Sequence, residues 1–383
     1  MDRLSSLTGL RALAAFAVFA GHGVSLALFA DQSVQQGYGF VASNLGIWGV
    51  TCFFVLSGFV LTWSSSAGDR APDFLRRRLV KVFPNHVVVF AAAVVILLVS
   101  GAAIDPGAAV ATLFLVQAWS PDSAVLLNSI NGVTWSLSAE LLFYVLFPVL
   151  IRPVRRIPVQ RLWFAFAVVA VLAMSLPYLA RIALPDQPMS IFSETTPWPR
   201  QWAVEFFPPG RLLEFVAGML LARIVRDGRW IGLPVWPVVA CLAVLYAATL
   251  NISMVDGYHS ISLVPFGLII AGLAAADTAG RRGWLGGRAM VWLGGVSYAF
   301  FVVHLLALRS VHALLQGEWG ISGAYTRTTF GPVGGIVFLL VGLLVCILLA
   351  WALTVFVERP AMRRWARSRK RVPGAQDRRP QRV

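Results

Sequence analysis

Two polar residues in an apolar segment are the first candidates for chemistry in this sequence. The stretch LTGLRALAAFAVFAGHG, Leu7 to Gly23, is apolar or small-sided except at Arg11 and His22. In a helix of about 100° per residue, eleven steps end about 20° past three full turns, so both side chains lie on one face, about 16 Å apart along the axis. A permanent cation and a titratable base inside a spanning segment are costly and indicate a functional site.

The composition indicates that these residues lie in a membrane. Hydrophobic residues make up 58% of the 383 residues and charged ones 13%, whereas a soluble domain has about 25% charged residues. Ten apolar windows have spanning length: Leu7–Phe29, Leu45–Trp63, Val82–Ser100, Val133–Ile151, Leu162–Ile182, Arg211–Val225, Leu233–Leu250, Ile261–Ala276, Val291–Leu314 and Pro332–Phe356. We expect an all-α polytopic membrane protein with about ten transmembrane helices. The shorter window Ala108–Trp119 predicts one additional re-entrant or interfacial segment.

Basic residues gather in five places outside these apolar cores, and their sides decide the topology. The fifth cluster is the C-terminal tail. The four internal clusters are Arg70/Arg76/Arg77/Arg78/Lys81, Arg152/Arg155/Arg156/Arg161, Arg226/Arg229 and Arg281/Arg282/Arg288. If Ala108–Trp119 does not span, every cluster and the N-terminus fall on one side. The positive-inside rule then predicts a multi-pass protein of the inner or plasma membrane with both termini in the cytoplasm.

The formal net charge of +15 does not indicate a nucleic-acid partner. From Arg359 to Val383, ten basic residues accompany Asp377 as the only acidic one, which suits a topology anchor beside anionic lipid of the bilayer. We expect a membrane domain over residues 1–358 and an Arg-rich, largely disordered cytoplasmic tail over residues 359–383. The three cysteines show no pairing or metal spacing, and we expect no metal.

Glu140 is a candidate partner for His22. Counted from Val133, Glu140 lies about 10 Å below the outer membrane surface, and His22 lies about equally deep. A carboxylate at that depth could orient His22 as a general base. The alternative is a buried glutamate satisfied by Ser136, Ser138 or an arginine.

His304 also falls in the outer half of the membrane. It lies thirteen residues beyond Val291, about 20 Å from the cytoplasmic end of its helix. It is either part of the same polar site or one partner of an ordinary hydrogen bond between helices.

The stretch FLRRRLVKVFP places four cations, Arg76, Arg77, Arg78 and Lys81, at the inner surface, where the helix that carries Arg11 begins. One interpretation is topology anchoring alone. The other is a phosphate site, since the guanidinium group makes paired, charge-assisted bonds to phosphate. Arg11 would then hold an anionic head group, and His22 would sit at the far end of an extended cofactor arm.

Six further stretches follow the Arg11–His22 pair in order: GVTCFFVLSGFVL, RRLVKVFP, WSLSAELLFYVLFP, GRLLEFVAGMLLA, VSYAFFVVH and VERP. Together they resemble the acyltransferase-3 family of membrane O-acyltransferases, which modify surface polysaccharides, peptidoglycan, lipids and macrolides. The resemblance extends from about Leu7 to Pro360. Two positions depart from the family: Leu141 follows Glu140 where a second acidic residue is frequent, and Asn85–His86 stand where an aromatic residue is common.

The resemblance implies an acyl-CoA donor, most often acetyl-CoA, with Arg11 toward the CoA and His22 as the catalytic base. It also implies roles for Glu140 and for a set of residues that we assign to substrate binding: Trp135, Ser136, Ser138, Arg211, Ser297, Tyr298 and His304. The implied acceptor is a hydroxyl of a glycan, a lipid-linked sugar or a small natural product.

We therefore expect an enzyme in which His22, oriented by Glu140, deprotonates the acceptor hydroxyl for attack on the thioester. An acyl-His22 intermediate is the kinetic alternative. A transporter or flippase that uses the same polar path is the alternative from another class. Its best pointer, a pair of broken helices in corresponding halves of the chain, is missing from the sequence.

Overall fold

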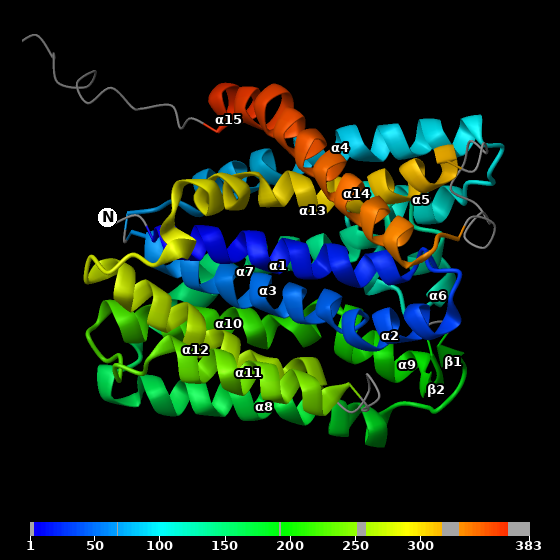
Figure 1. Ribbon diagram of the computed structural model, residues 1–383. Helices are drawn as coiled ribbons and strands as arrows, with labels where there is room; N and C mark the ends of the chain where they lie inside the picture. Colours follow the sequence, from blue (N-terminus) through cyan, green and yellow to red (C-terminus); the bar gives the residue numbers. More distant parts are fainter. Residues whose placement is uncertain (1–3, 67, 191–192, 251–257, 316–328, 367–383) are drawn as a thin grey trace, which may run out of the picture.

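The computed structural model describes residues 4–366 except for 67, 191–192, 251–257 and 316–328. Ten long helices are present within these residues, and all except α14, which crosses obliquely, lie side by side in one bundle (Figure 1). They are α1 (Ser5–Val24), α3 (Leu45–Ser64), α4 (Ala71–Val99), α7 (Trp135–Arg156), α8 (Leu162–Ala183), α10 (Pro208–Arg226), α11 (Val235–Thr249), α12 (Tyr258–Thr278), α13 (Arg288–Leu315) and α14 (Pro332–Leu353).

Each of the ten predicted windows coincides with one of these helices. In the described part of the chain, eight helices are long and apolar enough to cross a membrane. Of the other two, α10 carries four charged residues and α11 has 15 residues, shorter than a usual span. The expected all-α polytopic membrane fold is confirmed.

Successive long helices run in opposite directions, so the basic clusters come together. The connections after α3, α7, α10 and α12 lie at the end of the bundle where the N-terminus lies (Figure 1). The short helices η3 (Val159–Arg161), η6 (Trp284–Gly286) and α15 (Arg359–Trp365) and the π-helical turn η7 (Thr354–Glu358) also belong to this end, which we call the basic end. Residues 367–383 of the predicted tail lie outside the described residues.

The opposite end is built from short elements. They are α2 (Gln32–Ala42), α5 (Pro106–Leu113), η1 (Gln117–Trp119), α6 (Ser123–Leu127), η2 (Gly132–Thr134), the antiparallel strands β1 (Met189–Ser190) and β2 (Ser193–Pro197), α9 (Trp198–Gln201) and the π-helical turn η4 (Trp202–Phe206).

The predicted short segment re-enters the bundle as α5 and η1. His86, which is buried halfway along α4, donates from Nε2 to the carbonyl oxygens of Thr112 (3.1 Å) and Leu113 (3.2 Å) at the end of α5. Asn131, just before α7, donates from Nδ2 to the carbonyl oxygen of Val302 on α13 (2.8 Å). The chain therefore starts α7 from inside the bundle, and not from its surface.

α3 and α10 pack closely against each other through two glycines. A Cβ atom on Gly58 would lie 1.9 Å from the carbonyl oxygen of Phe215, and one on Gly218 would lie 2.0 Å from that of Val55. Only glycine permits so close an approach of two backbones, as is frequent between membrane helices. α3 also packs against α1, which carries Arg11 and His22.

Candidate active site

Arg11 and His22 lie on the face of α1 that packs against α13. Arg11 lines a cavity together with Ser297 and Tyr298 of α13, and His22 contacts His304, further along the same helix. The expectation that both polar groups share one helix face is confirmed.

The two histidines form a pair in the interior of the bundle. His304 Nε2 lies 3.1 Å from His22 Nδ1, and the ring centroids are 5.0 Å apart. His304 is fully buried and stacks on Phe300 with ring planes only 4° apart, whereas His22 is half-buried. His22 is therefore the more accessible member of the pair, and His304 is enclosed behind it.

The backbone contacts of the pair define its protonation. His22 Nδ1 lies 2.9 Å from the carbonyl oxygen of Val18, and His304 Nδ1 lies 2.7 Å from that of Phe301. Since a carbonyl oxygen only accepts, each neutral ring carries its proton on Nδ1 and a lone pair on Nε2. The His22 Nδ1 proton is then shared between Val18 and the Nε2 lone pair of His304. His22 Nε2 is left as the lone pair that can act as a base.

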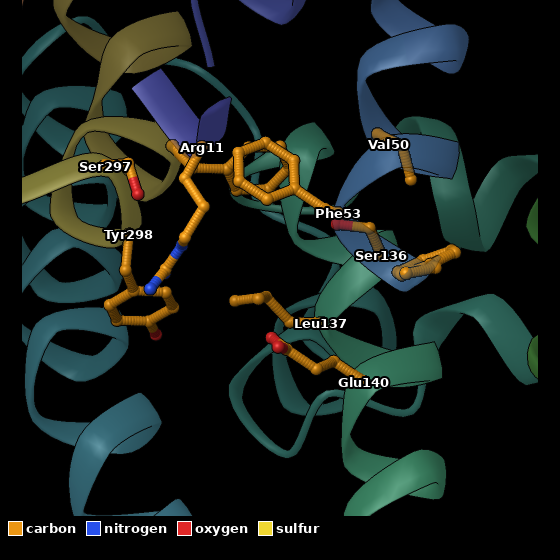
Figure 2. Close-up of a pocket in the computed structure, with 10 residues that line it drawn as sticks. Arg11, Val50, Phe53, Ser136, Leu137, Glu140, Ser297 and Tyr298 are labelled. Carbon is orange, nitrogen blue, oxygen red and sulfur yellow. The ribbon is translucent and has the colours of Figure 1, made fainter. Parts of the chain in front are cut away.

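A polar cavity lies nearer the basic end, between α1, α3, α4, α7 and α13. It consists of two adjoining hollows of about 50 and 100 Å³, which share Arg11, Phe53, Glu140 and Tyr298 in their walls. The Arg11 guanidinium and the Glu140 carboxylate both point into it (Figure 2). The smaller hollow adds polar atoms from Ser136 and Ser297, and the larger adds Arg78, Lys81 and Tyr144.

The cations of this cavity are held in place by their neighbours. Lys81 makes an ion pair with Glu358 of η7, and Asn85 donates from Nδ2 to the second oxygen of that carboxylate (3.1 Å). The Lys81 ammonium also lies 5.8 Å from the ring centroid of Tyr298. Arg78 lies over the ring of Phe74. Three cations therefore accompany two carboxylates, Glu140 and Glu358, and the cavity suits an anion.

Arg76 and Arg77, which the sequence grouped with Arg78 and Lys81, lie elsewhere. Arg76 pairs with Asp73 at 3.5 Å and Arg77 with Asp69 at 3.9 Å, and their side chains are 40% and 36% exposed. Neither lines the polar cavity. The structure therefore divides the predicted cation cluster into an inner pair and a surface pair.

Glu140 does not lie beside His22. It accepts a hydrogen bond from the Tyr144 hydroxyl (2.5 Å) and shares the polar cavity with Arg11. The equal depth expected from the sequence was wrong because α7 begins inside the bundle: Asn131 is already level with Val302, and Glu140 follows about 13 Å further toward the basic end. Among the contacts of the described residues, the place opposite His22 Nδ1 belongs to His304.

The predicted substrate-binding residues of α7 differ in their surroundings. Ser136 lines the polar cavity. Trp135 packs edge-on against Phe54 and Phe206 at ring distances of 6.4 and 5.0 Å. Ser138 is buried and donates to the amide oxygen of Gln117 (3.3 Å). Of the three, only Ser136 faces the cavity.

The remaining predicted residues lie on α10 and α13. Ser297 and Tyr298 line the polar cavity, and the Tyr298 hydroxyl donates to the carbonyl oxygen of Val82 (2.7 Å). Arg211 is 1% exposed within the α3–α10 contact, where Nη2 lies 3.1 Å from Glu214 and 3.0 Å from the Thr51 hydroxyl. Arg211 is thus part of a buried ion pair outside the cavity walls.

Two residues near the polar cavity, Glu358 and Tyr144, are not singled out by the sequence. Glu358 was noticed only as part of the stretch VERP, and Tyr144 only as part of WSLSAELLFYVLFP. The spacing of Tyr144, one helical turn after Glu140, could have identified it. Glu358 lies 277 residues from Lys81, and no local pattern predicts that contact. In the described part of the chain no group of three histidine, cysteine or acidic side chains is placed to hold a metal ion.

Comparison with known proteins assigns this arrangement to a family. The family model for the acyltransferase domain matches residues 4–355. Acyltransferase MdmB of Streptomyces mycarofaciens is 38% identical over 375 residues, which cover 96% of this chain and 94% of that protein. No solved structure matches the chain. The resemblance inferred from the sequence is confirmed, and the chain is an acyltransferase that belongs to the acyltransferase-3 family.

Proposed function

We propose that this membrane acyltransferase moves an acetyl or other short acyl group from acyl-CoA to a hydroxyl of a glycan, a glycolipid or a small natural product. The contact between His22 and His304 carries the proposal, because it prepares one imidazole nitrogen as a base on the same helix face as Arg11. The proposal places the basic end in the cytoplasm, where CoA esters are made.

In this proposal the polar cavity receives the phosphate groups of the donor. Arg11 and Arg78 bind phosphate oxygens through planar guanidinium groups, and Lys81 adds a point charge. The Glu140 carboxylate offsets part of the positive charge of the cavity, and its hydrogen bond from Tyr144 holds it on the wall that faces Arg11. The extended part of the donor then carries the thioester along α1 toward His22, about 16 Å away.

The reaction is a direct transfer. The acceptor hydroxyl gives its proton to His22 Nε2, and its oxygen attacks the thioester carbonyl carbon. The carbon–sulfur bond of the resulting tetrahedral intermediate breaks, and the thiolate takes the proton from the imidazolium. His304, a positioning residue, accepts a hydrogen bond from His22 Nδ1–H and stabilises the imidazolium, which is the role of the carboxylate in a serine hydrolase triad.

The test is transfer by the purified protein from radiolabelled acetyl-CoA. His22→Ala should lose a factor of about 10² to 10⁴ in rate, the usual contribution of general acid–base catalysis, and should bind acetyl-CoA as the unaltered protein does. His312→Gln is the control, because His312 is a buried histidine on α13, the helix of His304, where it packs against Phe338 and not against His22. Loss of only a few-fold in His22→Ala would exclude it as the base. Mass spectrometry of glycans and lipids from a deletion strain identifies the acceptor by the missing acyl mass.

A further inference from the structure

A second hollow lies on the side of α1 that faces away from the polar cavity. It has a volume of about 620 Å³ and runs between α1 and α3 on one side and α11 and α12 on the other, with η6 at its basic end. It shares no lining residue with the polar cavity. Its volume falls in the range of about 300–1,000 Å³ that is usual for ligand sites. We call it the lateral groove.

The walls of the lateral groove are apolar, and its floor is built from small residues. Ala14 and Ala17 of α1 leave the space, and larger side chains such as Phe266 and Leu242 form the opposite wall. Such a surface binds a hydrocarbon chain through burial of apolar area, which stabilises the complex by about 0.8 kcal/mol per methylene group.

The end of the groove near the basic loops has a different chemistry. Arg281 is the charged side chain among the lining residues, and it is joined there by Trp284 and Trp236, which are 59% and 73% exposed. Tryptophan together with arginine is the combination that membrane proteins place at the level of the lipid head groups. The groove therefore begins at the interface and continues into the hydrocarbon region.

The charge at this end is positive. Arg282 follows Arg281 directly in the connection between α12 and α13. The nearby acidic residue, Asp277, is buried and accepts hydrogen bonds from the backbone N–H (2.8 Å) and the hydroxyl (2.7 Å) of Ser6. Its carboxylate is thus occupied within the protein, and the mouth of the groove suits an anionic group.

We infer that the lateral groove binds one anionic phospholipid, with an acyl chain between α1 and α11 and the phosphate at Arg281. A zwitterionic lipid also offers a phosphate, but its quaternary amine cancels that charge, whereas basic residues near a membrane surface contribute about 1 kcal/mol each toward a lipid with net negative charge. The acyl donor is a poorer fit, because the groove has no base and one cation where a CoA ester has several phosphate charges. This site is independent of the proposed transfer reaction.

The test is native mass spectrometry of the purified full-length protein in detergent micelles with equal amounts of phosphatidylglycerol and phosphatidylcholine. The unaltered protein should retain one phosphatidylglycerol molecule in preference to phosphatidylcholine. Arg281→Gln should reduce that preference about five-fold, the factor that corresponds to about 1 kcal/mol. Arg288→Gln is the matched control at the start of α13, since Arg288 does not line the groove, and it should keep the preference.

A second variant tests the binding of the lipid's acyl chain separately from that of its head group. Ala243 is exposed and lines the groove, so Ala243→Trp should fill the groove without disturbing the packed core, and should lose the retained lipid of either kind. Equal retention of both lipids by the unaltered protein would overturn the inference. Equal losses in Arg281→Gln and Arg288→Gln would also overturn it, because they would indicate general attraction to the basic end. Retention that persists in Ala243→Trp would show that the lipid binds elsewhere.

Discussion

The two histidines differ in burial, and the difference separates their expected roles. His304 is enclosed and touches His22 through Nε2, so it acts on the reaction through His22. We expect His304→Ala to lower kcat for acyl transfer about 10-fold or more with little change in the KM for acyl-CoA. His304→Gln should recover part of the loss, because its amide oxygen can accept a hydrogen bond from His22 Nδ1–H. The measurement is steady-state transfer at saturating acceptor, and equal losses in both variants would indicate a purely structural role.

Arg11 and the surface arginines provide a second contrast at the residue scale. Arg11→Lys should bind acyl-CoA poorly, because a point charge does not replace a planar two-bond contact to phosphate. Arg76→Ala and Arg77→Ala should weaken binding only slightly and mainly at low salt, because exposed charges are worth about 0–1 kcal/mol and are screened. Binding is measured at two salt concentrations for each variant. Equal, salt-sensitive losses at all three positions would show that Arg11 acts as another surface charge.

Lys81 and Glu358 test whether the ion pair serves the donor cavity. Glu358→Gln should lower the unfolding temperature, since loss of one partner from a fully buried pair costs about 3–5 kcal/mol. The cost is smaller here because the Lys81 side chain is 28% exposed. Adding Lys81→Met should restore much of the stability, because no charge is left unpaired. The double variant should bind acyl-CoA more weakly than the unaltered protein, because it lacks the Lys81 charge. Binding equal to that of the unaltered protein would remove Lys81 from the donor site.

At the scale of elements, the contact between α3 and α10 depends on two glycines. Gly58→Ala or Gly218→Ala would place a methyl group about 2 Å from a backbone carbonyl oxygen of the other helix, so the helices must separate. We expect a clear fall in the thermal unfolding midpoint for each. Gly37→Ala in α2 is the control, because nothing lies within 4 Å of its added methyl group and alanine favours a helix by about 0.5–1 kcal/mol. Midpoints that are unchanged in all three variants would contradict the close packing.

The elements were largely predictable from the sequence, and their depths were not. Ten apolar windows predicted ten helices, because spanning length and hydrophobicity are local properties. The depth of Glu140 was missed because it depends on the path of α5 and η1, which is fixed by distant contacts such as His86 to Thr112 and Asn131 to Val302. The pairing of His22 with His304 depends on the packing of α1 against α13. A single sequence does not contain that information.

For the whole molecule, the arrangement of basic clusters at one end predicts the topology. A reporter fused after Trp119 should give an extracytoplasmic signal, and reporters after Arg156 and after Arg288 should give cytoplasmic signals. The physical reason is that all internal basic clusters fall at the end of the bundle where the N-terminus lies (Figure 1). A cytoplasmic signal after Trp119 would contradict the re-entrant path of α5.

The ion pair between Lys81 and Glu358 can form only late in the synthesis of the protein. The two residues are 277 positions apart, so at about 5–20 residues per second a ribosome needs about 14–55 s to supply the carboxylate after the lysine has been made. His22 likewise waits for His304. A nascent chain that stalls before the last long helix therefore lacks Glu358, the partner of Lys81. One that stalls before α13 also lacks His304, the partner of His22. In the proposed mechanism, such unfinished copies lack residues for donor binding or for activation of the acceptor hydroxyl.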